Sequence, residues 1–396
     1  MRSFLFFRHI PGSAYLIISL LFLNSCTSFM LGSRHHAQHD MAVVRILLLK
    51  TKVSVAISSE SQIRMTGAVA QTREQSTPQN AFVFSPKDIV EAIRIDPGNS
   101  PLFMNGQPYR GSIEMRSAGG TISVINILTV DDYLLSVVPG EIPANWEEEA
   151  LKAQAVAART YTYYQILANS KKPDGFDLEA TTNSQVYRGM NEEKPRTTEA
   201  VRETSGEIIT FDAKPILSYF HSTCGGKTID DSHVWNTSHL PYLEGVSCGF
   251  CTDSTKFEWE SRLSLDEIRN SLLKKYSALG AIQNISFRKK DDRVTEVYIR
   301  HSRGNLKITG NTFRLLFPPE KVRSLYFTSK KYNSGLVLAG HGWGHGVGMC
   351  QWGARGMALR GYRYQEILKH YYTDVALTSV RNRYIASRLK DARDCR

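Results

Sequence analysis

Residues 340–354 read GHGWGHGVGMCQWGA, and this stretch is the most informative part of the sequence. Six of its fifteen residues are glycine, interleaved with two histidines, two tryptophans and a glutamine. Glycine at this density costs backbone entropy and side-chain packing, so we expect it where the chain turns tightly or closely approaches another group. Imidazole, indole and carboxamide groups on such a loop suit a polar, ring-shaped ligand. The alternative is a glycine-rich hairpin that caps a sheet, although hairpin turns rarely combine these three side chains.

The chain has 396 residues, enough for one large domain or for two to three smaller ones with a core each. Its composition, 42% hydrophobic and 22% charged, is that of a globular protein, and its formal net charge is +11. A basic surface suits nucleic acid, anionic lipid or an anionic polymer such as cell wall. Because no block of lysine and arginine resembles a nucleic-acid patch, we expect no nucleic-acid partner.

The N-terminus has the features of an export signal. Arg2 and Arg8 precede an apolar run at 14–23, which is too short to span a bilayer comfortably. The run leads into LNSC at 23–26, which resembles a bacterial lipobox with Cys26 as the lipidated residue; a cleaved signal peptide is the alternative. We therefore expect a signal peptide at 1–25, a tether at 26–40 and an exported, lipid-anchored protein of the cell envelope, periplasmic in location.

The pattern of apolar residues predicts an α+β fold. A β-rich region is expected at 41–130, and the clearest helix at 145–168, opened by Asn145 with Glu148 completing a capping box. A second helix is expected at 264–276, opened by Ser264 or Asp266, then a hairpin and third strand within 285–317 and a last helix at 364–372. We place the functional core at 131–375, with a helix and hairpin segment at 260–330, and a C-terminal tail at 376–396.

Two pairs of potential metal ligands stand 23 residues apart. His221 and Cys224 form one pair, Cys248 and Cys251 the other, and each pair is separated by two residues. This spacing is typical of a structural zinc site closed by two knuckles. A disulfide among the cysteines remains an alternative, as does another role for His221.

Glu141 is the strongest candidate for an acid. It lies in PGEIP (139–143), where we expect the two prolines to hold a rigid loop ahead of the long helix. Nearby Ile142 and Trp146 would desolvate the carboxyl and raise its pKa, as a general acid requires. The competing interpretation is that Glu141 only complements the dipole of the following helix.

His341 and His345 are weaker candidates. They are four residues apart on a glycine loop, so they need not share a face, and a third metal ligand is not evident. A pair of His345 with Cys350 could act as base and nucleophile, but nothing in the sequence orients the imidazole.

Four segments resemble the stage II sporulation protein D / LytB family of peptidoglycan enzymes. They are DDYLLSVVPGEIPANWEEEALKAQAVAARTYTYY (131–164), SQVYRG (184–189), YFHSTCGGKT (219–228) and GHGWGHGVGMCQWGARGMALRGYRYQEILKHYYTD (340–374), in family order. The chain departs from the sporulation type before SQVYRG, where metal-ligand cysteines and a histidine are missing, and at Cys350, which is often serine.

The resemblance implies a lytic transglycosylase that cleaves peptidoglycan between N-acetylmuramic acid and N-acetylglucosamine and leaves a 1,6-anhydro end. Glycan stripped of its stem peptides would be the preferred substrate. Glu141 matches the family's general acid, and no cofactor is implied for catalysis. The expected substrate contacts are Lys152, Gln154, Arg159, Gln185, Tyr187, His345 and Gln351. Lys152 and Arg159 would meet the lactyl carboxylate of denuded glycan, or would instead pair with the acidic residues at 147–149.

Two other functions fit the same sequence. LytB-type relatives imply a non-catalytic, wall-binding activator of an N-acetylmuramoyl-L-alanine amidase, which would be a protein partner. A zinc-dependent hydrolase that uses His341 and His345 is the third interpretation.

Overall fold

A computed structural model describes residues 42–381, except 69–72, 75–79, 171, 173–174, 182–183 and 236–238, and also residue 387. The expected signal peptide, the tether, Cys26 and most of the expected tail lie outside the described residues. No helix in the described part of the chain has the length and apolar character needed to cross a membrane.

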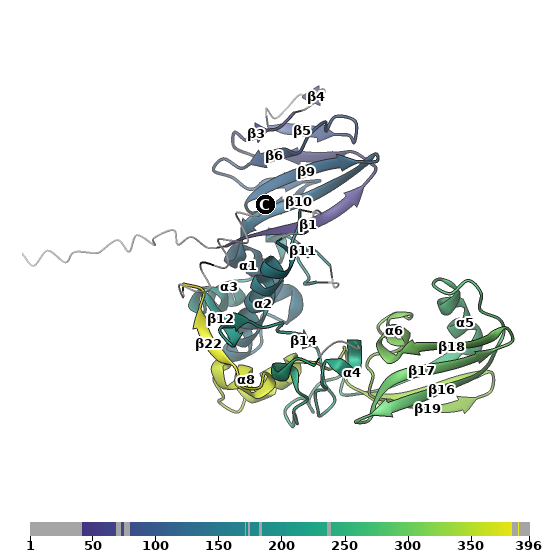
Figure 1. Cartoon of the computed structure of the whole chain (residues 1–396). Helices are drawn as coiled ribbons and strands as arrows, with labels where there is room; N and C mark the ends of the chain where they lie inside the picture. The colour runs from purple at the N-terminus through teal and green to yellow at the C-terminus, as the bar shows by residue number, and fades with distance from the viewer. Residues whose placement is uncertain are drawn as a thin grey trace, which may run out of the picture. The chain divides into compact units, whose positions relative to one another are not determined.

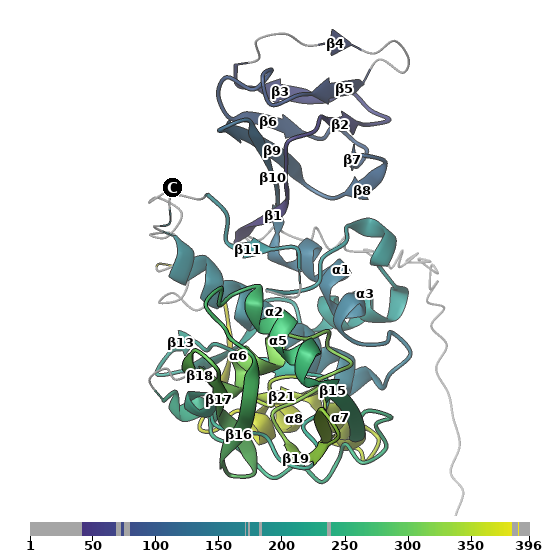
Figure 2. The same cartoon turned by 90° about the vertical axis from the view of Figure 1, so that its right-hand side faces the viewer.

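The β-rich N-terminal region forms two sheets (Figures 1 and 2). The larger has the order β11 (Leu178–Glu179), β1 (Val43–Thr51), β10 (Thr121–Thr129), β9 (Ser112–Ala118), β6 (Ile93–Asp96) and β3 (Arg64–Thr66). The smaller has the order β4 (Arg73–Glu74), β5 (Ala81–Phe84), β2 (Val55–Ser58), β7 (Leu102–Met104) and β8 (Gln107–Tyr109). Side chains alternate along β1, where Val44 and Ile46 are fully buried, as the period of a strand requires.

Two helices follow this region directly. Helix α1 (Val130–Glu141) begins where β10 ends, and helix α2 (Glu148–Asn169) packs against it. The alanine-rich side of α2 is buried against α1, α3 (Pro195–Glu203), α7 (Gln351–Ala358) and α8 (Tyr364–Tyr371). The predicted capping box at Asn145 is wrong, because α2 begins three residues later and its N-cap, Glu147, makes no side-chain capping bond.

Short elements surround the helices. The sheet β13 (Lys214–Pro215), β12 (Glu207–Phe211), β22 (Ala376–Ser379) contacts α2 through β12 and β13, and β14 (Phe220–His221) pairs in parallel with β21 (Met349–Cys350). The remaining elements here are η1 (Met190–Glu192), α4 (Ser232–Trp235) and η2 (Pro241–Leu243). Tyr372 and Met349 are among the fully buried residues of this part of the core.

An insertion separates β14 from β21 along the chain. It contains the sheet β15 (Glu258–Ser264), β20 (Gly335–His341), β19 (Phe327–Tyr332), the sheet β16 (Ile282–Lys290), β17 (Arg293–His301), β18 (Gly304–Thr309), and helices α5 (Leu265–Leu273) and α6 (Gly310–Leu315). The predicted helix opened by Ser264 is confirmed, and Ser264 forms a capping box with Glu267. The predicted three-stranded meander is also confirmed, although residues 310–315 form α6 rather than strand. Helices and antiparallel strands occupy separate stretches of the chain, so the predicted α+β class is confirmed.

Candidate active site

Glu141 is the last residue of helix α1. The helix begins at Thr129, whose side chain accepts a hydrogen bond from the Asp132 amide over 3.1 Å, and it ends where Ile142 adopts an extended conformation. The predicted rigid loop between two prolines is therefore wrong, since Pro139 lies inside the helix. Residues 133–138 of α1 are all buried, so the helix is packed on every side there, and this burial outweighs the cost of a proline near its end.

The Glu141 carboxylate is held by groups from two distant segments. The Val186 amide donates to its Oε1 over 2.9 Å, and the Gln351 side chain forms a second hydrogen bond with it. Burial raises the pKa of Glu141, while these two hydrogen bonds act in the opposite direction. The C-terminal end of a helix also disfavours a negative charge. The predicted direction of the pKa shift is thus confirmed, and the side chain is still partly exposed to solvent.

Gly140 allows the segment around Val186 to approach helix α1. A Cβ atom at position 140 would lie 3.2 Å from both Cγ1 and the carbonyl oxygen of Val186. Glycine here is therefore explained by a close approach next to Glu141, and it needs no unusual backbone angle.

Gln351 is the first residue of helix α7, directly after the glycine-rich stretch. Its Nε2 donates to Oε1 of Gln154 over 3.3 Å, and Nε2 of Gln154 is buried without a partner among the described residues. Two of the predicted substrate contacts therefore lie together, and one of them reaches Glu141.

A row of aromatic side chains begins near Glu141 and was missed by sequence reasoning. Burial raises the pKa values of Tyr133 and Tyr161, and the nearby charge of Glu141 raises them further. The ring of Tyr161 is 6.1 Å from that of Tyr219, which is 4.5 Å from that of Trp235. Tyr219 and Trp235 are both half-buried. The only signal for Tyr219 was its position within YFHSTCGGKT.

The glycine-rich stretch folds as a tight loop whose backbone packs closely. Gly342, Gly344, Gly346 and Gly348 all have positive φ, and a Cβ atom at Gly348 would lie 2.1 Å from the carbonyl oxygen of Tyr219. The glycines therefore permit turns and close contacts that other residues would not.

The two histidines of this loop occupy different environments. His345 hydrogen-bonds through Nε2 to the Phe220 carbonyl and through Nδ1 to the Val347 amide, and its ring contacts Trp235 at 5.2 Å. His341 ends strand β20, where its ring packs on Tyr326 at 4.9 Å. Within the described residues, neither belongs to a group of three or more metal-ligating side chains.

Lys152 is engaged by three carboxylates. Its Nζ lies 2.5 Å from Glu148, 3.4 Å from Glu149 and 2.5 Å from Glu203. Glu148 and Glu149 belong to the acidic stretch at 147–149, the alternative partner of Lys152 expected from the sequence.

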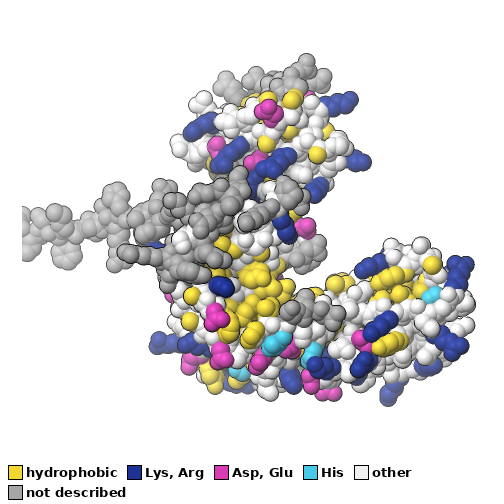
Figure 3. Space-filling view, in the orientation of Figure 1, with side chains coloured by type: hydrophobic (Ala, Val, Ile, Leu, Met, Phe, Trp, Pro, Cys, Tyr) yellow, Lys and Arg dark blue, Asp and Glu magenta, His cyan; other side chains and the backbone are white. Residues whose placement is uncertain are grey.

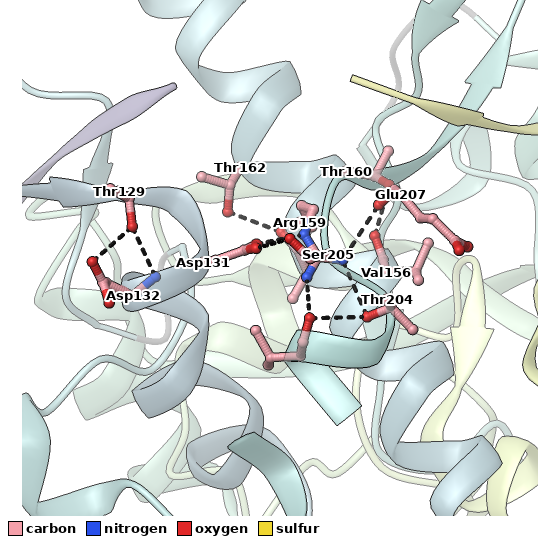
Figure 4. Close-up of polar contacts among 12 residues, drawn as sticks. Thr129, Asp131, Asp132, Val156, Arg159, Thr160, Thr162, Thr204, Ser205 and Glu207 are labelled. Carbon is pink, nitrogen blue, oxygen red and sulfur yellow. Dashed lines mark hydrogen bonds and ion pairs between the residues drawn. The ribbon is translucent and has the colours of Figure 1, made fainter. Parts of the chain in front are cut away.

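Arg159 has no exposed surface, which differs from the expected substrate contact. Its Nε donates to Asp131 over 2.8 Å, and its terminal nitrogens donate to Thr204 and to the Val201 and Glu207 carbonyls (Figure 4). The guanidinium thus joins α2 to α1 and to the end of α3, away from the acidic residues at 147–149.

Gln185 and Tyr187 also lie inside the protein, contrary to their expected place against substrate. Gln185 accepts from the hydroxyls of Tyr133 and Thr162, and the Tyr187 hydroxyl donates to Asn126 over 2.7 Å. Both side chains are almost fully buried. Their hydrogen bonds instead fix the segment that presents the Val186 amide to Glu141.

The cysteine cluster differs in one member from the predicted set. Cys224, Cys248, Cys251 and Cys350 are buried, form no disulfide, and have all their sulfurs within 4.8 Å of one another. His221 does not lie within this group of sulfurs. Its Nδ1 hydrogen-bonds to the Val347 carbonyl over 3.1 Å, and its Nε2 is buried without a hydrogen-bond partner among the described residues. Burial also lowers its pKa to about 4.

The chain matches two family models. Residues 118–211, which include Glu141 and Val186, match the model described as stage II sporulation protein. Residues 249–348, which include the insertion, match a model described as a domain of unknown function.

Several known proteins are similar to most of the chain. An uncharacterised protein of Brachyspira hyodysenteriae is 42% identical over 275 residues, covering 69% of this chain and 73% of the relative. Stage II sporulation protein D of Bacillus subtilis is 31% identical over 284 residues, covering 67% and 80%. The amidase enhancer of the same organism is 30% identical over 293 residues, covering 62% of this chain and 40% of the relative. By its similarity to stage II sporulation protein D over most of that protein's length, and by its match to the family model, the chain belongs to the stage II sporulation protein D family.

Proposed function

We propose that the protein is a peptidoglycan lytic transglycosylase with Glu141 as its acid and base. The observation that carries this proposal is the partly exposed Glu141 carboxyl, whose pKa is raised by burial. A raised pKa increases the fraction of Glu141 that carries a proton at a given pH, which favours action as a general acid. Glu141 would protonate the bridging oxygen between N-acetylmuramic acid and N-acetylglucosamine and so release the leaving sugar.

A single carboxylate is sufficient for this reaction. The muramic acid 6-hydroxyl attacks C1 of its own ring, Glu141 takes up the hydroxyl proton, and a 1,6-anhydro end forms without consuming water. Glycosidases that use water need a second carboxylate nearby.

Gln351 and the aromatic row are the proposed glycan-binding groups. Gln351 would orient Glu141 and hydrogen-bond to an amide of the sugar, while Gln154 would hold Gln351 in place. Tyr219 and Trp235 would pack against sugar rings, and the glycine-rich loop that carries His345 would form a wall of the binding cleft.

Arg314 is the cation that we propose for the lactyl carboxylate of denuded glycan, in place of Lys152 and Arg159. Its guanidinium, on helix α6, hydrogen-bonds to Asn311 and has no ion-pair partner in the described chain. Burial lowers the pKa values of His221 and His345, and the charge of Arg314 lowers them further. Helix α6, which carries Arg314, contacts helix α4, which carries Trp235 of the aromatic row.

The insertion would add general attraction to an anionic wall. Figure 3 shows lysine and arginine side chains over the part of the molecule that carries β16–β18. Exposed basic residues there are Arg288, Lys289, Lys290, Arg300, Arg303 and Lys307. Export and a lipid anchor at Cys26 would place the protein against peptidoglycan in the periplasm.

The test is to incubate the purified protein with peptidoglycan, either intact or stripped of stem peptides by an amidase, and to analyse the products by mass spectrometry. We expect fragments one water lighter than hydrolysis products, from stripped glycan above all, and none with Glu141→Gln. Hydrolytic products would contradict the proposal.

A second function is favoured by the similarity to the amidase enhancer. In that case the protein would release no glycan fragments and would instead accelerate an added N-acetylmuramoyl-L-alanine amidase. The same incubation with the amidase present, followed by release of stem peptides, distinguishes the two. An accelerating effect that survives Glu141→Gln would favour the enhancer.

A further inference from the structure

We propose that Cys224, Cys248, Cys251 and Cys350 bind one zinc ion as a tetrathiolate, and that this structural site fixes the start of helix α7. The proposal does not depend on the glycan chemistry. It replaces His221 of the sequence prediction with a ligand from 126 residues beyond Cys224.

The sulfur positions suit one tetrahedral ion. Zinc–sulfur bonds are about 2.3 Å, which places the sulfurs of a tetrahedral site about 3.8 Å apart. The four sulfurs lie within 4.8 Å of one another, and those of Cys224 and Cys251 are 3.5 Å apart. Small side-chain rotations would therefore close the group around an ion.

Backbone amides point at these sulfurs. The Cys224 and Gly353 amides donate to the Cys350 sulfur over 3.2 and 3.3 Å, and the Gly226 amide donates to the Cys251 sulfur. The Tyr371 hydroxyl lies 3.1 Å from the Cys248 sulfur. Donors of this kind stabilise anionic thiolates and orient them as ligands.

A buried arginine supplies the counter-charge. Arg293 is 4% exposed, and no carboxylate oxygen in the described chain lies within ion-pairing distance of it. Its guanidinium donates to the Cys224 and Lys227 carbonyls and stacks on Tyr326 at 4.2 Å. A buried cation is costly unless it is paired. Zinc with four thiolates carries a net charge of −2, so the site would supply the anion that Arg293 lacks.

The site would connect three parts of the chain at a position that matters for Glu141. Cys224 follows β14, Cys248 and Cys251 precede the insertion, and Cys350 ends β21 and caps helix α7. Gln351, which hydrogen-bonds to Glu141, is the next residue. We infer that Cys350 acts through the metal as a positioning residue for Gln351.

The experiment is to purify the full-length protein without chelator, measure its metal content by mass spectrometry and record the zinc X-ray absorption spectrum. We expect about one zinc per chain with only sulfur neighbours at about 2.3 Å. Cys350→Ser should lose most of the zinc, whereas the control His221→Ala should retain it.

Three results would overturn the proposal: a chain that carries iron or no metal, disulfides among these cysteines, or zinc that survives Cys350→Ser and is lost in His221→Ala. If Cys350→Ser does not fold, the wild-type spectrum still separates four sulfurs from three sulfurs and a nitrogen. Cys350→His should then restore both folding and zinc, with one nitrogen neighbour. Because metal content does not depend on glycan cleavage, failure of this proposal is distinguishable from failure of the proposed function.

Discussion

The Val186 amide donates a hydrogen bond to Oε1 of Glu141 over 2.9 Å, and Gly140 leaves the space that this contact requires. A donor aimed at the carboxylate favours its charged form, while burial favours the neutral form. The balance raises the pKa of Glu141 and leaves the group able to accept a proton again after giving one up. This pair of opposing effects is what an acid that later acts as a base needs.

Gly140→Ala should disrupt this contact. The new Cβ would lie 3.2 Å from two atoms of Val186, so the loop must move a few tenths of an ångström away from Glu141. We expect glycan cleavage to fall about 10- to 100-fold, as small misplacements near a reacting group do. Val186→Ala in the same chain removes one of the two atoms and should restore part of the rate. An unchanged rate in Gly140→Ala would show that the Val186 contact does not matter for cleavage.

Glu141→Gln should abolish cleavage and stabilise the fold at neutral pH. Loss of a general acid costs roughly 10²–10⁴-fold in rate. The folded-state pKa of Glu141 is raised, so the charged group destabilises the native state as the pH rises above the unfolded value near 4.5. Melting temperatures should therefore be higher for the variant at pH 7 and equal at pH 4. Equal melting temperatures at both pH values would contradict the raised pKa.

Replacing Arg159 should destabilise the fold much more than replacing Lys152. Arg159→Ala removes a fully buried side chain together with its ion pair to Asp131 and its hydrogen bonds to Thr204, Val201 and Glu207, which should cost about 3–5 kcal/mol of unfolding free energy. Lys152→Ala removes surface ion pairs and should cost about 1 kcal/mol or less. Chemical denaturation measures both. If Arg159→Ala folds normally but binds glycan poorly, the original expectation of a substrate contact would be correct.

His345 should make the fold sensitive to acid. Burial holds its pKa well below 6.5 in the folded protein, so the unfolded chain binds a proton that the native state does not. Stability is complete above pH 6.5 and falls as the pH decreases below that value. His345→Gln can keep the hydrogen bond to the Phe220 carbonyl and should flatten the dependence of the melting temperature between pH 6.5 and 5. An unchanged slope would show that other groups cause it.

Arg314→Ala should weaken the binding of denuded glycan, whose lactyl carboxylate is charged. If the guanidinium meets the lactyl carboxylate, KM for denuded glycan should rise about tenfold, as a single charged hydrogen bond predicts, while kcat changes little. Arg323, an arginine that stacks on Trp343, provides a control variant, Arg323→Ala, with KM expected to stay constant. A fall in kcat alone would contradict a binding role for Arg314.

The local features of the fold were accessible from sequence. The start of helix α5 at Ser264 and the strand meander that follows depend on neighbours within a few residues, and both are present as predicted. Helix α1 was not predicted, because Pro139 suggested a loop and the packing that overrides this preference involves distant strands and helices.

In the site, too, the sequence predicts what lies in a local motif and does not predict what depends on distant partners. Glu141 and Gln351 could be identified because they lie in recognisable segments. The roles of Arg159, Gln185 and Cys350 depend on partners between 23 and 126 residues away. No spacing rule indicates that Cys350 rather than His221 joins the other cysteines. Cys350 reaches them through the parallel pairing of β21 with β14, the strand that precedes Cys224.

The insertion also has a consequence for how the chain can fold. Its first and last strands, β15 and β20, pair antiparallel, with Glu258 opposite His341, so its two ends lie side by side. Once the insertion has folded, the loop that must close to pair β14 with β21 shortens from about 130 residues to fewer than 50. Loop-closure entropy grows with the logarithm of length, so this order of events lowers the cost of closure by roughly 1 kcal/mol. The segment that separates the two halves of the site along the chain thereby also brings them together in space.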